Sequence, residues 1–244
     1  MLPAPFGWPG GKRQLKARII ALIPPHKTYV EPCAGAASVF WAKPRSPVEA
    51  LNDLDADLMR FYEALPKLEH CDVHTLAQDF PGLVAKQGQQ QPCEFLAGVA
   101  CSFGNKRGNY AHSGSQAQLC LRNAPTFHQN LPWYKERLKG VHLHNEDWAT
   151  TVMRYDAPDT FFYFDPPYHG TARPYQGGSV DVLDRLAELL PSLKGKWLLS
   201  YDDHPSVRQA FRQFSKRSVE STYTIAAGNN RLRGRQVFIS NFPI

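Results

Sequence analysis

Short apolar runs alternate with amphipathic segments in both the first and the last part of the chain. Five runs predict strands, and they cover residues 28–30, 48–51, 141–144, 160–164 and 196–200. Apolar residues at helical spacing predict helices at 12–23, at 183–193 and at 206–214, and further helices after the first two strands, the second through about Leu65. Strands followed by helices predict a parallel sheet with right-handed crossovers, closed by an antiparallel hairpin of residues 223–226 and 236–240.

This rhythm breaks between residues 66 and 139. Glutamines gather at 87–91, and glycine, asparagine and serine are frequent at 104–116, with scattered helical pieces between them. We therefore expect an α/β catalytic domain formed by residues 1–65 and 140–244. Residues 66–139 would form a smaller, mostly helical domain inserted into it.

Charge is distributed unevenly over the chain. The 28 Lys and Arg residues exceed the 22 Asp and Glu residues, which gives a formal net charge of +6. The excess of basic residues lies in 101–140 and 204–244, whereas 141–203 is acidic. Two basic segments around an acidic one favour a bound polyanion next to a site that carries carboxylates, with a solvated basic face as the alternative.

Other classes of protein are excluded by simple features. No stretch approaches 18 consecutive apolar residues, and the first residues lack a secretory signal pattern, so we expect a cytoplasmic protein without membrane contact. The five cysteines form no CxxC pair, which predicts unpaired thiols in a reducing compartment. We expect no metal site, because Cys71 with His74, or His142 with His144, does not supply four ligands.

The most specific feature is the sequence Asp165-Pro166-Pro167-Tyr168, directly after the predicted strand at 160–164. In an open α/β sheet such a position faces the ligand crevice. The carboxylate of Asp165 can accept a hydrogen bond from an exocyclic amine, and the prolines stiffen the turn and leave carbonyl acceptors. Tyr168 can stack on a planar base. The alternative is a strand ended by proline, with Tyr168 packed in the core.

Four motifs in order resemble the Dam-type (D12 class) adenine-N6 DNA methyltransferases. They are Trp8-Pro-Gly-Gly-Lys12, the segment from Val30 through Glu31-Pro32-Cys33-Ala34-Gly35-Ala36 to Phe40, Asn52-Asp53, and Asp165 to Tyr168. The resemblance covers about residues 6–65 and 140–244 and is weak in the insertion, apart from 102–110. It implies a Rossmann-like S-adenosylmethionine-dependent methyltransferase sheet with helices on both faces.

The resemblance also implies which residues bind the cofactor S-adenosylmethionine. They are Trp8, Gly11, Lys12, Glu31, Pro32, Ala34, Gly35, Ala36, Asp53, Asp147, Trp148 and Asp165. Asp53 would bind the ribose hydroxyls, and Asp147 would border the adenine of the cofactor. Residues 31–36 could instead form a plain strand–helix turn, Asp53 a helix N-cap and Asp147 a surface cap.

The implied reaction is methyl transfer to the N6 amine of an adenine flipped out of double-stranded DNA. Asp165 and the Pro166 carbonyl would accept the amine hydrogens, and Tyr168 would stack on the base. Residues that suit contact with DNA are Asn105, Lys106, Arg107, Asn109, Tyr110, Arg122, Lys135, Arg137, Asn230, Arg231 and Arg233.

The sequence is also compatible with other functions. The same chemistry could act on ribosomal RNA, because some RNA methyltransferases also carry Asp-Pro-Pro-Tyr. Cytosine-N4 methylation is less favoured, since those enzymes more often carry serine at the position of Asp165. A non-catalytic DNA-binding protein is a different class, and the missing GxGxxG pattern counts against a nicotinamide oxidoreductase. A monomer suits the expected enzyme, and a restriction endonuclease is a conceivable partner.

Overall fold

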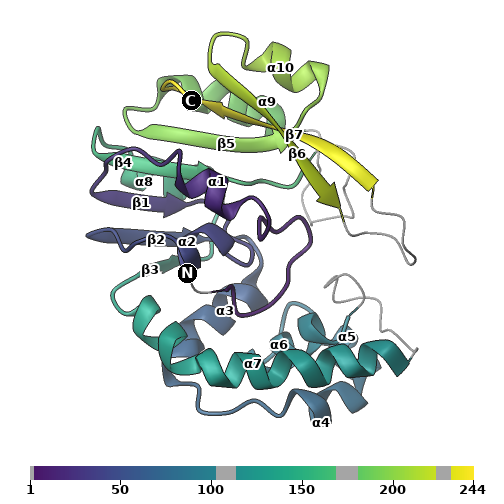
Figure 1. Cartoon of the computed structure of the whole chain (residues 1–244). Coiled ribbons are helices and arrows are strands. Elements are labelled where there is room, and N and C mark those ends of the chain that lie inside the picture. The colour runs from purple at the N-terminus through teal and green to yellow at the C-terminus, as the bar shows by residue number, and fades with distance from the viewer. Residues whose placement is uncertain (1–2, 103–113, 169–180, 224–231) are drawn as a thin grey trace.

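The fold is built on one seven-stranded sheet (Figure 1). This computed structural model describes residues 3–102, 114–168, 181–223 and 232–244. The strands follow the spatial order β3-β2-β1-β4-β5-β7-β6. Their bounds are β1 Thr28–Glu31, β2 Val48–Asn52, β3 His142–His144, β4 Thr160–Phe164, β5 Lys196–Asp202, β6 Ser215–Tyr223 and β7 Leu232–Ser240.

The strands β1 to β5 form the parallel part of the sheet. Strand β1 lies between β2 and β4, with Val30 opposite both Ala50 and Phe162. The five strands predicted from apolar runs are therefore confirmed. The hairpin is antiparallel as predicted, and its first strand, β6, begins as early as Ser215 and includes Tyr223. The rest of the predicted stretch 223–226 lies outside the described residues. Strand β6 lies at the sheet edge and carries several charged residues, so it lacks the apolar run that identified the others.

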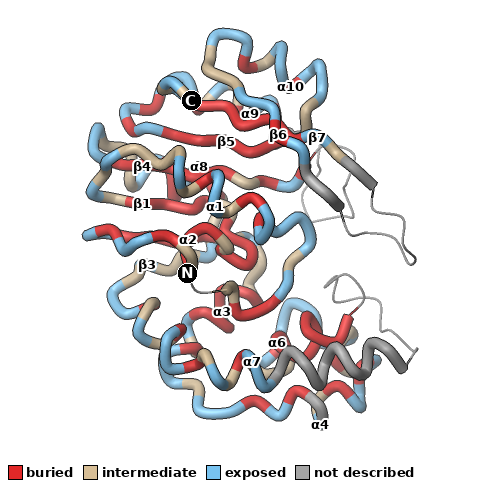
Figure 2. Tube along the Cα trace, in the orientation of Figure 1, coloured by how far each residue is buried: buried red, intermediate tan, exposed pale blue. Residues whose placement is uncertain are grey.

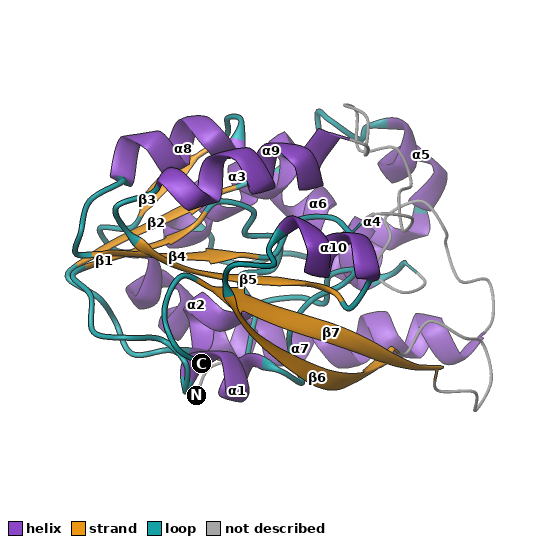
Figure 3. Cartoon of the chain, turned by 90° about the horizontal axis from the view of Figure 1, so that it is seen from above, coloured by secondary structure: helices purple, strands orange, loops and turns teal. Residues whose placement is uncertain are grey.

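Helices cover both faces of the sheet, as expected for a methyltransferase fold. Figure 3 shows α1 and α2 on one face and α8 and α9 on the other. Their bounds, with those of other helices of the catalytic part, are α1 Lys16–Ile20, α2 Ser38–Ala42, α3 Ala56–Ala64, η1 Leu65–Lys67, α8 Trp148–Tyr155, α9 Asp181–Leu189, η3 Leu190–Ser192 and α10 Pro205–Ala210. No helix among the described residues is long and apolar enough to cross a membrane.

Side chains of β4 show how one strand serves two cores. Phe161 and Tyr163 belong to the buried cluster on the α1 and α2 side, whereas Phe162 and Phe164 belong to the cluster on the α8 and α9 side. Successive side chains of a strand point to opposite faces, and both faces here are covered by helices. A continuous aromatic run is therefore buried along its whole length, as Figure 2 shows for the central strands.

The segment 66–139 is helical in its described parts. It contains α4 Val73–Gln78, α5 Phe80–Ala85, α6 Pro92–Ala100 and α7 Gly114–Leu138, which gather on the β3 side of the sheet (Figure 1). Phe95, Phe127 and Tyr134 of this segment join the same buried cluster as Phe161 of the sheet. The helices thus share a core with the catalytic part, and their role as a separate recognition domain stays a prediction.

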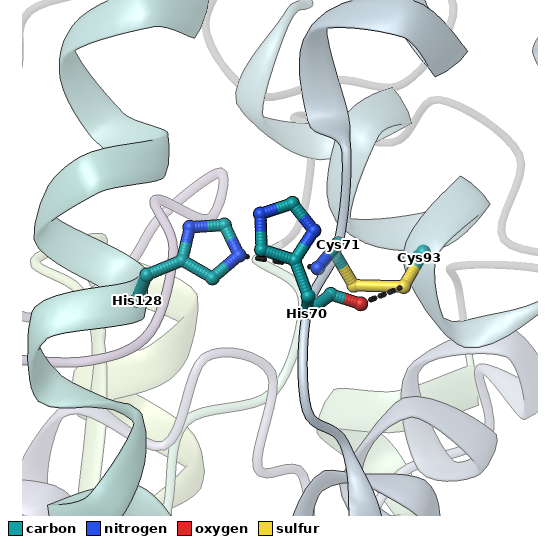
Figure 4. Close-up of a disulfide and its surroundings, with 4 residues drawn as sticks. All are labelled: His70, Cys71, Cys93 and His128. Carbon is teal, nitrogen blue, oxygen red and sulfur yellow. Dashed lines mark hydrogen bonds between the residues drawn. A yellow bond between two sulfur atoms is a disulfide. The ribbon is translucent and has the colours of Figure 1, made fainter.

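The prediction of unpaired thiols is wrong for this segment. Cys71 and Cys93 form a disulfide, drawn in Figure 4, and Cys101 is disulfide-bonded as well. Cys71 precedes α4 and Cys93 lies at the start of α6, and the packing of these helices brings the two Cα atoms within 5.2 Å. That separation suits a disulfide, but sequence spacing gave no sign of it. Among the described cysteines, Cys33 is free.

Candidate active site

The carboxyl ends of β1 and β4 lie side by side at the point where the chain connections diverge. From β1 the sheet continues to β2 on one side, and from β4 it continues to β5 on the other. In open α/β sheets ligands bind at such a switch point. The predicted residues 31–36 begin at the last residue of β1, and the predicted residues 165–168 follow β4. The fold therefore brings both motifs to one edge of the sheet, here called the switch-point edge.

A tight approach between Gly35 and Trp8 shapes the turn after β1. Gly35 has a φ of +49°, and a Cβ atom there would lie 2.7 Å from the Trp8 ring. Both features require glycine. The amide of Gly35 donates to Oδ2 of Asp53 at 2.8 Å, which ties the turn to the end of β2. Pro32, Ala34 and Ala36, the other small or rigid residues predicted here, are buried.

Asn52 links three loops at this edge, and sequence reasoning did not select it as a site residue. Its Nδ2 donates to the carbonyls of Pro32 at 2.8 Å and Glu146 at 3.0 Å, and its Oδ1 accepts from the Glu146 amide at 3.1 Å. The side chain is buried. Its place at the end of a predicted strand, directly before Asp53, was the available signal.

Asp53 is not the N-cap of the helix that follows it. Asp55 caps α3 by accepting from the Leu58 amide at 3.1 Å, whereas Asp53 bonds the amides of Gly35 and Asp55. The alternative of an N-cap at Asp53 is therefore wrong. The carboxylate instead lies next to the turn at which the resemblance places the cofactor.

Asp147 does act as a cap, as the alternative had it. Its Oδ1 accepts from the Ala149 amide at 2.9 Å at the start of α8. Arg185 of α9 binds both carboxylate oxygens, at 2.7 and 3.0 Å, and this guanidinium holds the pKa of Asp147 below its ordinary value. The same guanidinium lies 5.0 Å from the centroid of the Trp148 ring. Asp147 and Trp148 are thus fixed in place by α9.

Glu31 lies in the interior rather than on the crevice. Only 2% of the residue is exposed, and its Oε1 accepts from the Tyr29 hydroxyl at 2.7 Å and the Phe40 amide at 2.8 Å. Burial raises the pKa of Glu31 to about 8, although both hydrogen bonds oppose that rise and the charge of Asp165 adds to it. Glu31 therefore anchors the first turn of α2 beneath the site.

Donors converge on one oxygen of Asp165, the central residue of the site. Lys12 Nζ lies 2.5 Å from Oδ1, the Ser200 hydroxyl 2.9 Å and the Tyr168 hydroxyl 3.2 Å. Among the described residues none donates to Oδ2, and 19% of the side chain is exposed. Lys12 is itself buried and also donates to the Gly10 carbonyl at 2.8 Å. One oxygen is held by the protein, which leaves the other for a ligand.

Tyr168 is packed in the core, as the alternative for this residue had it. It is 7% exposed, its ring centroid lies 5.1 Å from that of Tyr201, and Lys12 Nζ lies 4.9 Å from its centroid. Pro166 is buried beside it and Pro167 is exposed. In this structure the Tyr168 hydroxyl donates a hydrogen bond to the Asp165 carboxylate.

Cys33 lies among the acidic residues of the site. Burial raises the pKa of its thiol, and the nearby carboxylates of Asp53, Asp165 and Asp147 add to that rise, whereas Arg185 opposes it. The three predicted acidic residues therefore act on one point of the switch-point edge. Lys12 pairs with Asp165 and Arg185 pairs with Asp147, so two of these three carboxylates already lie beside a cation of the protein.

The residues predicted to contact DNA are only partly described. Lys135 lies half-buried on α7. Arg137 does not lie on the surface: its side chain is 10% exposed, it binds both oxygens of Glu49, and it donates to the Phe40 carbonyl at 3.0 Å. The remaining predicted side chains lie outside the described residues, and they are Asn105, Lys106, Arg107, Asn109, Tyr110, Arg122, Asn230, Arg231 and Arg233.

Comparison with known proteins gives one family. The model of the D12 class N6 adenine-specific DNA methyltransferases matches residues 8–97 and 104–225. The match includes the turn after β1, Asp53, Asp147 and the sequence 165–168, and it continues through most of the helical segment. No curated protein matches the chain.

Proposed function

We propose, from the premise that this chain belongs to the D12 class N6 adenine-specific DNA methyltransferase family, that Asp165 receives the reacting amine at the switch-point edge. Membership makes the protein an S-adenosylmethionine-dependent enzyme that methylates adenine in DNA at N6. The observation that carries the proposal is the asymmetry of Asp165, whose Oδ1 takes the described donors.

The residues of the edge fit S-adenosylmethionine. The turn after β1 is built of small or rigid residues, with the Trp8 ring packed against Gly35, and the Asp53 carboxylate beside this turn is an acceptor for hydroxyl groups. Nε1 of Trp148 is buried and has no hydrogen-bond partner among the described residues, so it remains available to a ligand. When bound, the cofactor supplies an electrophilic methyl group. Residues proposed to surround it are Trp8, Gly11, Pro32, Ala34, Gly35, Ala36, Asp53, Asp147 and Trp148, with Glu31 supporting the turn from below.

Asp165 then orients the amine of the target adenine. The N6 lone pair is delocalised into the ring, which makes that nitrogen a weak nucleophile. An N6 hydrogen donated to Asp165 Oδ2, and a second donated to the Pro166 carbonyl, favour a pyramidal nitrogen and stabilise the positive charge that develops on it. Lys12 holds the carboxylate in place through Oδ1 and does not need to touch the base.

The base has to leave the duplex to reach this edge, because N6 is engaged inside the helix. Tyr168 would stack on the flipped base only if its ring moved from its packed position against Tyr201. We therefore propose that Pro167, which is exposed, contacts the base first and that Tyr168 contributes through Asp165. Lys135 and the predicted basic residues of 105–122 and 230–233 remain the proposed DNA contacts, without Arg137.

Methyl transfer from labelled S-adenosylmethionine tests the substrate. The enzyme would be offered unmethylated duplex DNA, the same duplex already methylated at adenine N6, and a structured RNA. We expect N6-methyladenine in the unmethylated duplex, with no label in the methylated one or in the RNA. Label on RNA alone would agree with the proposed reaction and contradict DNA as the substrate. Label on cytosine would overturn the assignment of the amine.

A further inference from the structure

Ser200 lies beside the reacting carboxylate, on the neighbouring strand. Strands β4 and β5 are parallel, and Phe164 pairs with Leu199, so Ser200 follows that pair as Asp165 does. The residue is fully buried, with 0% exposure. Ser200 is the polar residue that ends the predicted strand at 196–200, and the strand register places its hydroxyl beside Asp165.

Hydrogen-bond chemistry fixes the direction of the bonds that Ser200 makes. Its Oγ lies 2.9 Å from Asp165 Oδ1 and 3.2 Å from the Tyr163 hydroxyl. An ionised carboxylate only accepts, and a serine hydroxyl has a single hydrogen. Ser200 therefore donates to Asp165, and the Tyr163 hydroxyl donates to Ser200. Because Tyr163 is also buried, this chain of hydroxyls holds the carboxylate from inside the sheet.

The donors to Asp165 Oδ1 come from different parts of the fold. Lys12 precedes α1, Ser200 lies on β5, and Tyr168 lies on the loop after β4. A carboxylate held by a single donor can rotate about its terminal torsion, which is a soft one. Donors from three directions restrict that rotation, so Oδ2 keeps a constant orientation towards the crevice.

We propose that Ser200 is a positioning residue for methyl transfer, which acts by fixing the Asp165 carboxylate with Oδ2 towards the amine. The proposal rests on the proposed role of Asp165. Ser200 does not touch the base or the cofactor in this scheme. Its loss lowers the rate of the methyl-transfer step and leaves cofactor affinity intact.

Single-turnover methyl transfer of Ser200→Ala tests the proposal, at saturating S-adenosylmethionine and duplex DNA. We expect a rate roughly tenfold to a hundredfold below wild type, the range for losing one hydrogen bond to a charged group. The affinity for S-adenosylmethionine, measured by calorimetry, should stay within about threefold of wild type, where a general structural defect would weaken both.

Two further variants distinguish the hydrogen bond of Ser200 from its contribution to packing. Ser200→Cys fills the same space with a weak donor, so it should lose rate nearly as much as Ser200→Ala. Ser240→Ala is the matched control, because Ser240 is also fully buried in this sheet and donates to the Phe242 carbonyl instead. It should keep the wild-type rate.

The outcomes distinguish this proposal from the function on which it rests. Wild-type transfer with an undiminished Ser200→Ala rate would overturn the role of Ser200 and leave the function standing. Equal loss of rate in Ser200→Ala and Ser240→Ala, in step with their stability, would also overturn it. A wild-type enzyme that transfers no methyl group to DNA would overturn the function itself.

Discussion

Acidic residues at the switch-point edge lie in different surroundings, which shift their pKa values in opposite directions. Glu31 is buried with a pKa raised to about 8, so it stays mostly protonated at neutral pH. The pKa of Asp147 is lowered instead, mainly by Arg185. A neutral Glu31 adds no repulsion beneath the Asp165 carboxylate. The site therefore keeps its negative charge where it faces a ligand and suppresses it in the core.

The raised pKa of Glu31 predicts that the free energy of unfolding depends on pH. Its folded-state pKa of about 8 lies above the value of an exposed glutamate, so folding retains a proton that the unfolded chain releases between about pH 4.3 and 8. This contribution to stability is fully present below that window and is lost as the pH rises through it. Glu31→Gln keeps an acceptor and removes the titration.

Urea unfolding at pH 5, 6.5 and 8 measures the effect. The free energy of unfolding of Glu31→Gln, relative to wild type, should rise with pH by on the order of 1 kcal/mol per pH unit. The comparison of two proteins cancels the titration of every other group. Parallel pH profiles would contradict a protonated Glu31.

At the scale of elements, strands were more predictable than helices or connections. The predicted strand at 160–164, a threonine followed by aromatic residues, corresponds to β4 residue for residue, because burial on both faces favours a continuous apolar sequence. Helix α1 spans only residues 16–20, although the apolar pattern predicted 12–23. Helix α7 contains Pro125 and Pro132, which local propensity disfavours inside a helix, and tertiary packing overrides that preference here.

The candidate site also contains residues that the sequence predicted and residues that it did not. Motif order located the turn at 31–36, Asp53, Asp147 and Asp165, because each begins within three residues of the end of a predicted strand. The contacts of Ser200 and Asn52 could not be predicted from the sequence, since they depend on how the strands pair, although Asn52 belongs to one of the four motifs. Nor could it reveal that Arg137 turns inward to Glu49.

Removal of the Cys71–Cys93 disulfide should lower the stability of the protein. It closes a segment with a sequence separation of 22 that contains α4 and α5, and closing a loop of that length is worth about 3 kcal/mol. Cys71→Ser/Cys93→Ser should lower the free energy of unfolding by about that amount under non-reducing conditions. With a dithiol reductant present, the variant and the wild type should become equal in stability. A difference that persisted in reductant would show that the serines, rather than the lost bond, cause it.

At the scale of the whole molecule, the helical segment is joined to the sheet by charge as well as by packing. Arg137 of α7 binds Glu49 of β2, and Lys43, at the end of α2, binds the same carboxylate at 2.6 Å. These groups are buried, so they fix the end of α7 on the catalytic part. Lys135, the proposed DNA contact two residues before Arg137, is thereby held in place relative to the sheet.

The central claim is that Asp165 orients the amine, and one comparison tests it most directly. Single-turnover methyl transfer to duplex DNA would be measured for Asp165→Asn and for Asp159→Asn, an exposed residue before the opposite end of β4. We predict a loss of about a hundredfold or more for Asp165→Asn. S-adenosylmethionine binding should be retained, and Asp159→Asn should keep the wild-type rate. Transfer by Asp165→Asn at a rate near that of wild type would contradict the account.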